Sequence, residues 1–206
     1  MSDILGALRD KIKVDVDVPL LKASADKGLV GAIDQGTSST RFVVFTKDGK
    51  IAASAQVEHT QIFPSGEDKV GWHEHDPLEI WKNTCRCVEA VSDALTQQAG
   101  LDGKTSPLYK AVGITNQRET TLAWNADTGK PYFHAVVWDD VRTQDIAADI
   151  AGGDIDLVRD QTGLPLSSYS AGTRVKWLID NVPELQKDLH DPKTRDSVRF
   201  GTIDTW

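Results

Sequence analysis

The feature that most constrains the fold is a succession of three short apolar runs near the start of the chain. They read LVGAID (29–34), RFVVFT (41–46) and IAASAQVEHTQI (51–62), and each is rich in residues that favour β-strands. Between the second and third runs, Asp48-Gly49 is a strong signal for a hairpin turn. The sequence therefore predicts three antiparallel strands at the opening of a domain.

A long helix is predicted to follow these strands. Asp76 can cap its first turn, and Pro77 suits the first helical position. Apolar residues then recur at steps of three or four, which assigns Trp81 to the face that points into the core. Gly100 is placed to end the helix.

The remaining elements alternate in type. A short apolar strand is expected to be buried and is followed by a hairpin, two helices and a last strand. One helix is expected to be capped by Asp139 or Asp140, and the next, which carries Trp177 on its core side, to be interrupted by Pro183. In chain order these elements are 110–115, 120–138, 139–150, 172–182 and 200–206. The order of elements predicts an α/β domain with a mixed sheet flanked by helices.

The first 27 residues differ from the rest in being mixed and polar, with only a faint helical spacing of apolar residues. We interpret 1–27 as a flexible N-terminal extension, with a short docking helix as the alternative. Residues 28–206 are expected to form one domain.

Charge and hydropathy exclude two classes of protein. The net charge is −8 and no basic run is present, which argues against a general nucleic-acid binder because phosphate contacts need clustered cations. No apolar run approaches the roughly 20 residues that a membrane-spanning helix requires. Cys85 and Cys87, two residues apart, are poorly placed to bridge each other, which favours a reducing, cytoplasmic location.

The turn between the first two strands, DQGTSSTR (34–41), carries an unusual set of polar residues. Backbone amides and hydroxyl groups in such a turn can hold an anion, and a carboxylate beside them is favourable when a divalent cation lies between. The pattern assigns the cation to Asp34, the tight turn to Gly36 and the anion to the side chains of Thr37, Ser38, Ser39 and Arg41. The alternative is a polar hairpin turn without a ligand.

A second constellation, GITNQRETT (113–121), places polar residues directly after the predicted buried strand. Ligands of α/β sheets bind at the carboxyl ends of strands. Arg118 can donate to hydroxyl oxygens of a polyol and Glu119 can accept from its hydroxyl hydrogens. The alternative is a surface ion pair of little energetic value.

Two histidines, His73 and His75, precede the long helix and raise the possibility of a metal site. Histidines two apart in a loop are more often structural or solvated, and we interpret them in that way.

Taken together, five blocks of this chain resemble successive blocks of the glycerol kinases, in the same order and with similar spacing. The resemblance covers 29–206, and GITNQRETT is its most specific part, because related carbohydrate kinases share the Asp-x-Gly-Thr turn but differ at this strand end. The blocks are AIDQGTSSTRFVVF, GWHEHDPLEIW, AVGITNQRETTLAWNADTGKPYFHAVVW, TGLPLSSY and FGTIDTW.

The resemblance implies an α/β domain of the actin-like ATPase (ribonuclease H-like) fold, and ATP-dependent phosphorylation of glycerol to sn-glycerol 3-phosphate. It implies ATP and Mg²⁺ as cofactors, with Asp34 on the metal side and the 36–41 loop at the nucleotide phosphates. Arg118 and Glu119 match the pair that binds glycerol hydroxyls, Trp138 the aromatic that packs on the glycerol carbons, and Tyr169 a tyrosine that contacts a hydroxyl. We also expect the complete protein to be a homo-oligomer.

The chain departs from the family pattern in two places. Ser170 and Ala171 stand where relatives usually have Phe and Ser, which removes an aromatic near the substrate. The sequence also stops at Trp206, whereas the resemblance puts the catalytic base and the adenine pocket further along. The resemblance thus implies that 28–206 is the first, substrate-binding domain of a carbohydrate kinase, truncated before the second domain. We therefore expect no catalytic residue within this chain, and little activity from the chain alone. The alternatives are a kinase for another polyol or sugar, and a truncated, non-catalytic interaction module.

Overall fold

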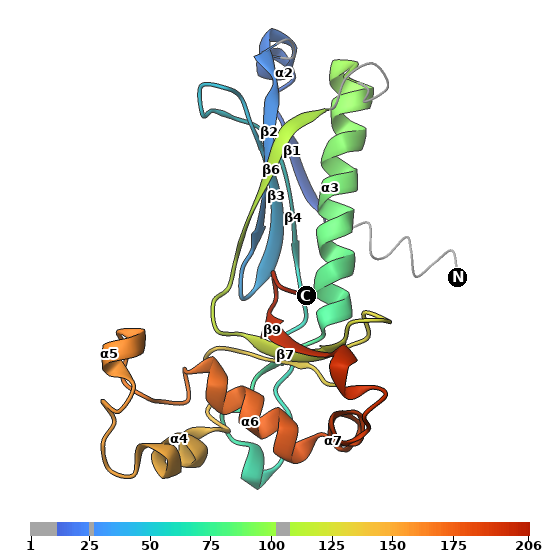
Figure 1. Cartoon of the computed structure of the whole chain (residues 1–206). Helices are drawn as coiled ribbons and strands as arrows, with labels where there is room; N and C mark the ends of the chain where they lie inside the picture. The colour runs from blue at the N-terminus through green and yellow to red at the C-terminus, as the bar shows by residue number, and fades with distance from the viewer. Residues whose placement is uncertain (1–11, 25–26, 102–107) are drawn as a thin grey trace. The chain divides into compact units, whose positions relative to one another are not determined.

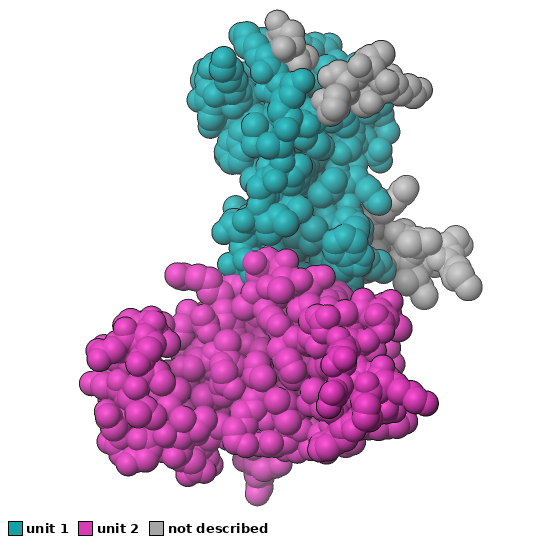
Figure 2. Space-filling view, in the orientation of Figure 1, with its two compact units in different colours: residues 1–60, 78–116 teal, residues 61–77, 117–206 magenta. Residues whose placement is uncertain are grey.

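A computed structural model describes residues 12–24, 27–101 and 108–206. The chain divides into two compact units, coloured separately in Figure 2. Unit 1 comprises 1–60 and 78–116, and unit 2 comprises 61–77 and 117–206. The single domain expected over 28–206 is therefore built from two units, and the chain passes between them more than once.

Unit 1 is a five-stranded sheet with one long helix along it (Figure 1). The predicted antiparallel strands are β2 (Leu29–Gln35), β3 (Ser39–Phe45) and β4 (Ile51–Glu58), and all three are confirmed. β6 (Tyr109–Asn116) pairs parallel to β2, so the sheet is mixed and has the order β1-β4-β3-β2-β6.

The long helix α3 (Pro77–Ala99) covers one face of this sheet, and its predicted start at Pro77 is confirmed. Burial of apolar side chains from both elements is the main force that holds them together. The shared core includes Cys87, Val91 and Leu95 from the helix with Leu29, Phe42, Val44, Ala52, Ala53, Ala55 and Val57 from the strands. Trp81 was predicted to lie in the core, which is wrong, because its side chain is 61% exposed.

The N-terminal segment differs from the flexible extension that the sequence predicts. β1 (Lys13–Val16) adds an antiparallel strand to β4, and α2 (Val18–Ser24) follows it. Leu21 of α2 is fully buried in the unit 1 core, which anchors the segment. The expectation of flexibility is therefore wrong for residues 12–24, and residues 1–11 and 25–26 lie outside the described part of the chain.

The strand β6 is exposed, whereas the sequence predicts that it is buried. Its apolar sequence predicts a buried strand, yet residues 110–115 are exposed, with half or more of the Val112 and Ile114 side chains accessible. The reason is positional, because β6 forms the edge of the sheet and pairs only with β2 among the described strands.

Unit 2 contains a four-stranded antiparallel sheet in the order β5-β8-β7-β9. Its strands are β5 (Glu74–His75), β8 (Ala135–Val136), β7 (Thr121–Asn125) and β9 (Val198–Thr202). The predicted hairpin is confirmed by the pairing of β7 with β8, and the predicted last strand corresponds to β9.

Four helices accompany this sheet: α4 (Gln144–Ala151), α5 (Arg159–Thr162), α6 (Ala171–Asn181) and α7 (Pro183–His190). The break at Pro183 is confirmed, since α6 ends before it and α7 begins on it. Leu178 and Leu185 of these helices pack with Ala123, Val136 and Val198 of the strands, and Trp177 lies against this core as predicted.

The start of α4 does not follow the prediction. Neither Asp139 nor Asp140 caps it, because the helix begins at Gln144 after Thr143. Asp140 instead accepts hydrogen bonds from the guanidinium and the backbone amide of Arg142. A carboxylate that is already paired to a neighbouring cation is not available as a cap.

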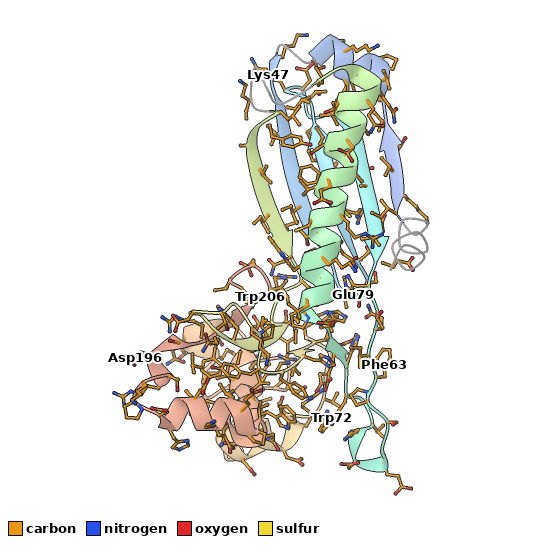
Figure 3. The ribbon with its side chains drawn as sticks, turned by 90° about the vertical axis from the view of Figure 1, so that its right-hand side faces the viewer. Lys47, Phe63, Trp72, Glu79, Asp196 and Trp206 are labelled. Atoms are coloured by element: carbon orange, nitrogen blue, oxygen red, sulfur yellow. The ribbon has the colours of Figure 1, made fainter. Side chains whose placement is uncertain are left out.

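Arg142 is the centre of a buried charge cluster in unit 2. Its guanidinium lies 2.8 Å from carboxylate oxygens of both Glu74 and Asp140. It also lies 4.0 Å from the ring centroid of Trp72, labelled in Figure 3, and 4.5 Å from that of Trp177. Such a cluster compensates the cost of burying each charge, and it ties the segment after Trp138 to β5 and α6.

Among the described residues, no helix is both long enough and apolar enough to cross a membrane.

Candidate functional site

The residues singled out from the sequence form two groups, one in each unit. The first is the turn between β2 and β3 in unit 1, which contains 36–38 and is flanked by Asp34 and Arg41. The second lies in unit 2 and contains Arg118, Glu119, Trp138 and Tyr169.

The β2–β3 turn is closed by a backbone hydrogen bond from the Gly36 amide to the Ser39 carbonyl, at 2.9 Å. Asp34 and Arg41 are partners across the β-ladder, and their side chains form an ion pair at 3.3 Å. Both side chains are about half exposed, so this pair contributes little to stability and its charges stay accessible to a ligand. The turn thus presents one carboxylate, one guanidinium and a set of hydroxyl groups at one end of the sheet.

The sequence predicts that the tight turn needs a glycine at position 36, and the structure does not support this reason. The Gly36 backbone is not in the left-handed region that favours glycine. A Cβ atom added there would lie 3.4 Å from the Ser39 carbonyl oxygen, which is ordinary contact. The turn therefore does not require glycine for its conformation, and the missing side chain matters only for what can approach the turn from outside.

The end of β4 holds the turn in place, which the sequence analysis missed. His59 Nε2 lies 2.8 Å from the Thr37 carbonyl oxygen, and the His59 amide donates to the Ser38 carbonyl at 3.2 Å. The Gln56 side-chain amide donates to the Ser39 hydroxyl at 3.0 Å. Pairing β3 with β4 residue by residue, starting from the Asp-Gly hairpin, could have placed these residues opposite the turn. A register shift between Val44 and Phe45 makes such a simple pairing wrong by one residue.

Burial lowers the pKa of His59, against the opposing effects of the Thr37 carbonyl and the Glu79 carboxylate. The folded state thus favours the neutral ring, whereas the unfolded chain takes up a proton near the ordinary pKa of 6.5. The stability that neutral His59 provides is fully present above this pH, and it is lost as the pH falls from there toward the lowered pKa of the folded state.

We therefore expect His59→Gln to reduce the loss of stability between pH 7.5 and pH 5, because glutamine cannot take up a proton but can still donate a hydrogen bond. The measurement is the urea midpoint of unfolding across this range. His190→Gln, at an exposed position of α7, controls for the loss of a histidine as such. If the urea midpoints of wild type and His59→Gln fell in parallel as the pH is lowered, protonation of His59 would not be a cause of the lost stability.

In unit 2, the backbone of Glu119 has a φ of 66°. This angle lies in the left-handed region, which residues with a Cβ rarely adopt. Its carboxylate accepts a hydrogen bond from the Ala171 amide at 3.0 Å, and its carbonyl accepts one from the Thr121 hydroxyl at 2.8 Å. Strained backbone held by surrounding contacts is common at ligand sites. Within the described residues no ion pair joins Arg118 to Glu119, which argues against the simple surface-pair interpretation.

Trp138 and Tyr169 lie beside each other, with ring centroids 6.3 Å apart in an edge-to-face arrangement. Trp138 is 38% exposed and Tyr169 is partly exposed, so both rings can contact a ligand. The structure thus brings Trp138 and Tyr169 together, and ties Glu119 to the start of α6, two residues after Tyr169. Arg118 is exposed and next in sequence to Glu119.

The segment behind Trp138 is connected to the histidines by a chain of hydrogen bonds. Thr120 Oγ1 accepts from the Trp138 amide at 3.2 Å and donates to the Gln117 side chain at 2.7 Å. Gln117 in turn lies 3.3 Å from His75, which shares the Gln61 side-chain oxygen with His73. These contacts give both histidines a structural role.

Among the described residues, no group of three or more His, Cys, Asp or Glu side chains is arranged to hold a metal ion. Asp34 is a single accessible carboxylate beside the hydroxyl-rich turn. This fits Mg²⁺, which is usually held by one or two carboxylates together with phosphate oxygens rather than by an all-protein cage.

Comparison with known proteins places these two groups in context. The pattern of the FGGY family of carbohydrate kinases, N-terminal domain, matches residues 29–206. The chain is 46% identical over 184 residues to a glycerol kinase of Haloferax volcanii, covering 86% of this chain and 34% of that protein. It is 47% identical over 177 residues to a glycerol kinase of Vibrio atlanticus, covering 85% and 32% respectively. The chain thus spans about a third of the length of these relatives.

Solved structures give the same answer for the fold. The glycerol kinase of Plasmodium falciparum with ADP superposes with a TM-score of 0.75 at 30% identity, covering 86% of this chain and 33% of that one. The gluconate kinase of Lactobacillus acidophilus superposes with a TM-score of 0.64 at 19% identity, covering 85% and 31%, and supports the fold alone. The predicted α/β architecture of the actin-like ATPase fold is therefore confirmed. Because the matched pattern extends from residue 29 to residue 206, the chain belongs to the FGGY family of carbohydrate kinases and corresponds to the N-terminal domain of that family.

Proposed function

We propose that the protein containing this chain transfers the γ-phosphoryl group of ATP to glycerol and forms sn-glycerol 3-phosphate. The observation that carries the proposal is the grouping at the start of α6 in unit 2. There a strained Glu119 is bound by the Ala171 amide, and Trp138 packs edge-to-face on Tyr169. The identity of 46–47% to curated glycerol kinases supports the same substrate.

In this proposal the unit 2 residues bind glycerol. Arg118 and Glu119 hydrogen-bond its hydroxyl groups, Trp138 packs on its carbon chain and Tyr169 contacts a further hydroxyl. A small polyol needs such a combination of polar pairs and an apolar wall. Ser170 and Ala171 leave that wall smaller than in the relatives that carry an aromatic here, because neither side chain can replace one.

The unit 1 turn handles the nucleotide. The hydroxyl groups and amides of 36–39, with Arg41, hold the phosphates, and Asp34 stands on the side of Mg²⁺. Phosphoryl transfer depends mainly on positioning and on neutralising charge. The accessible guanidinium of Arg41 can neutralise phosphate charge directly, and the accessible carboxylate of Asp34 can contribute by holding Mg²⁺.

We also propose a cellular location for the protein. The structure leaves Cys85 and Cys87 as free thiols, which suits a reducing compartment, and we place the protein in the cytoplasm. Assembly of the complete protein into a homo-oligomer stays a prediction.

A substrate panel on the complete protein tests the function. Glycerol, xylulose and gluconate are offered with MgATP, and phosphorylated products are identified by ³¹P NMR. We expect the highest kcat/KM for glycerol. A higher kcat/KM for either of the other two compounds would replace glycerol by another substrate, and no turnover of any of them would favour the non-catalytic alternative.

Gly36→Val tests the turn. Its side chain is expected to reduce the affinity for MgATP by about tenfold or more, because it occupies the surface that the phosphates approach. The backbone tolerates a Cβ at this position, so the thermal midpoint should change little, and Gly36→Ala should give an intermediate affinity. Calorimetric titration with MgATP is the measurement. Normal affinity in a folded Gly36→Val variant would mean that the turn binds no phosphate.

A further inference from the structure

Arg174, in the first half of α6, is a fully buried cation that the sequence analysis did not single out. One of its terminal nitrogens donates to the Tyr169 carbonyl at 2.8 Å, and the other donates to the Trp138 carbonyl at 2.5 Å. Burial lowers its pKa, while the carboxylates of Asp140, Glu119 and Asp139 act in the opposite direction. An arginine starts from so high a pKa that the guanidinium remains charged.

The two carbonyl groups that Arg174 binds belong to the two aromatic residues of the proposed glycerol wall. Trp138 and Tyr169 come from separate segments of unit 2, after β8 and before α6. A planar guanidinium binds two acceptors in a fixed relative orientation. It therefore fixes the main chain at both positions, and with it the edge-to-face contact of the two rings.

The same turn of α6 also contacts the third proposed glycerol residue, because the Ala171 amide donates to the Glu119 carboxylate at 3.0 Å. Thr173 adds a hydrogen bond from its hydroxyl to that of Thr143, at 2.9 Å, which ties this turn to the start of α4. Glu119, Trp138 and Tyr169 are thus all held by the first four residues of one helix.

We propose that Arg174 is a positioning residue for glycerol binding, which sets the separation and angle of Trp138 and Tyr169 from behind. The proposal rests on the function proposed above. Arg174 is not a catalytic residue, because its fully buried side chain binds main-chain carbonyls and has no exposed surface for a substrate.

A buried arginine kept only for stability would behave differently on substitution. Removing a purely structural contact lowers the fraction of folded enzyme, and so lowers the apparent kcat without changing either KM. Loss of positioning displaces the rings that contact glycerol, so it raises the KM for glycerol and leaves the KM for ATP unchanged. Because small misplacements at a site can cost up to about 10²-fold, we expect a rise of about tenfold for Arg174→Met.

The experiment compares three variants of the complete protein with wild type. Arg174→Met removes the charge and both hydrogen bonds at similar length. Arg174→Lys keeps the charge but cannot bind both carbonyls in the same fork. Lys176→Met is the matched control on the same helix, because the Lys176 ammonium lies exposed and pairs only with Asp180 among the described residues.

The expected order of KM for glycerol is wild type and Lys176→Met lowest, Arg174→Lys intermediate and Arg174→Met highest, with the KM for ATP within twofold throughout. If Arg174→Met does not fold, the Arg174→Lys variant decides by the same criterion. An unchanged KM for glycerol, or an equal rise in both KM values, in a folded Arg174 variant would overturn the positioning role. Absence of glycerol turnover in wild type would instead remove the proposed function itself.

Discussion

Residues 1–206, produced alone, are expected to phosphorylate glycerol at least about a hundredfold more slowly than the complete protein. This chain spans about a third of the length of the glycerol kinases to which it is similar, and we expect the general base and the adenine pocket to come from parts of the complete protein outside residues 1–206. A positioned base alone contributes about 10²–10⁴-fold. Positioning of the nucleotide is a further requirement of phosphoryl transfer, and it would also be incomplete.

The measurement is a coupled assay of ATP consumption with glycerol, run on both proteins at equal molar concentration. Circular dichroism and the urea midpoint establish that the shorter protein is folded, so that inactivity is not confused with unfolding. A rate within tenfold of the complete protein would show that the catalytic residues lie within 1–206 and that the resemblance misplaces them.

Arg118→Ala in the complete protein is expected to lower kcat/KM for glycerol by about ten- to a hundredfold. A hydrogen bond to a charged group is worth about 1.5–3 kcal/mol, which corresponds to this range. Because Arg118 is exposed and no ion pair to it is present among the described residues, its removal should leave the fold intact. The KM for ATP should not change, since the residues proposed to bind the nucleotide lie in unit 1.

Steady-state kinetics with each substrate varied in turn provide the measurement. Arg195→Ala, at an exposed position of unit 2, is the matched control for deleting an arginine. Arg118→Lys should recover part of the activity, because an ammonium can donate to a hydroxyl but lacks the planar fork. Unchanged kcat/KM for glycerol in Arg118→Ala would remove Arg118 from the substrate site.

The sequence by itself was sufficient for features that depend on local chemistry. The strands at 29–34, 41–46 and 51–62 follow from their Val, Ile and Phe content and from the Asp48-Gly49 turn. The start of α3 at Pro77 and the break before Pro183 follow from the fixed φ and missing amide of proline. Each of these effects acts within a few residues, so it can be recognised without knowing what packs nearby.

The sequence alone could not show which apolar side chains are buried. The sequence of β6 is that of an inner strand, but its place at the sheet edge leaves it exposed. Trp81 has the spacing of a core residue and points outward, whereas Leu21 in a polar segment is fully buried. Whether an apolar side chain is covered depends on elements distant in the chain, and periodicity only says which residues share a face.

The candidate site likewise has one part that the sequence reveals and one part that only the tertiary structure reveals. The carboxylate and hydroxyl residues of 34–41 and the Arg118-Glu119 pair are recognisable because their chemistry is concentrated in single short stretches. Only the tertiary structure shows that Arg174 holds Trp138 and Tyr169, and that His59 holds the 36–39 turn. These contacts join residues between 5 and 36 positions apart, through side chains that bind main-chain carbonyl groups. Every residue has a carbonyl group, so no pattern of side chains in the sequence can reveal which of them a buried arginine or histidine will bind.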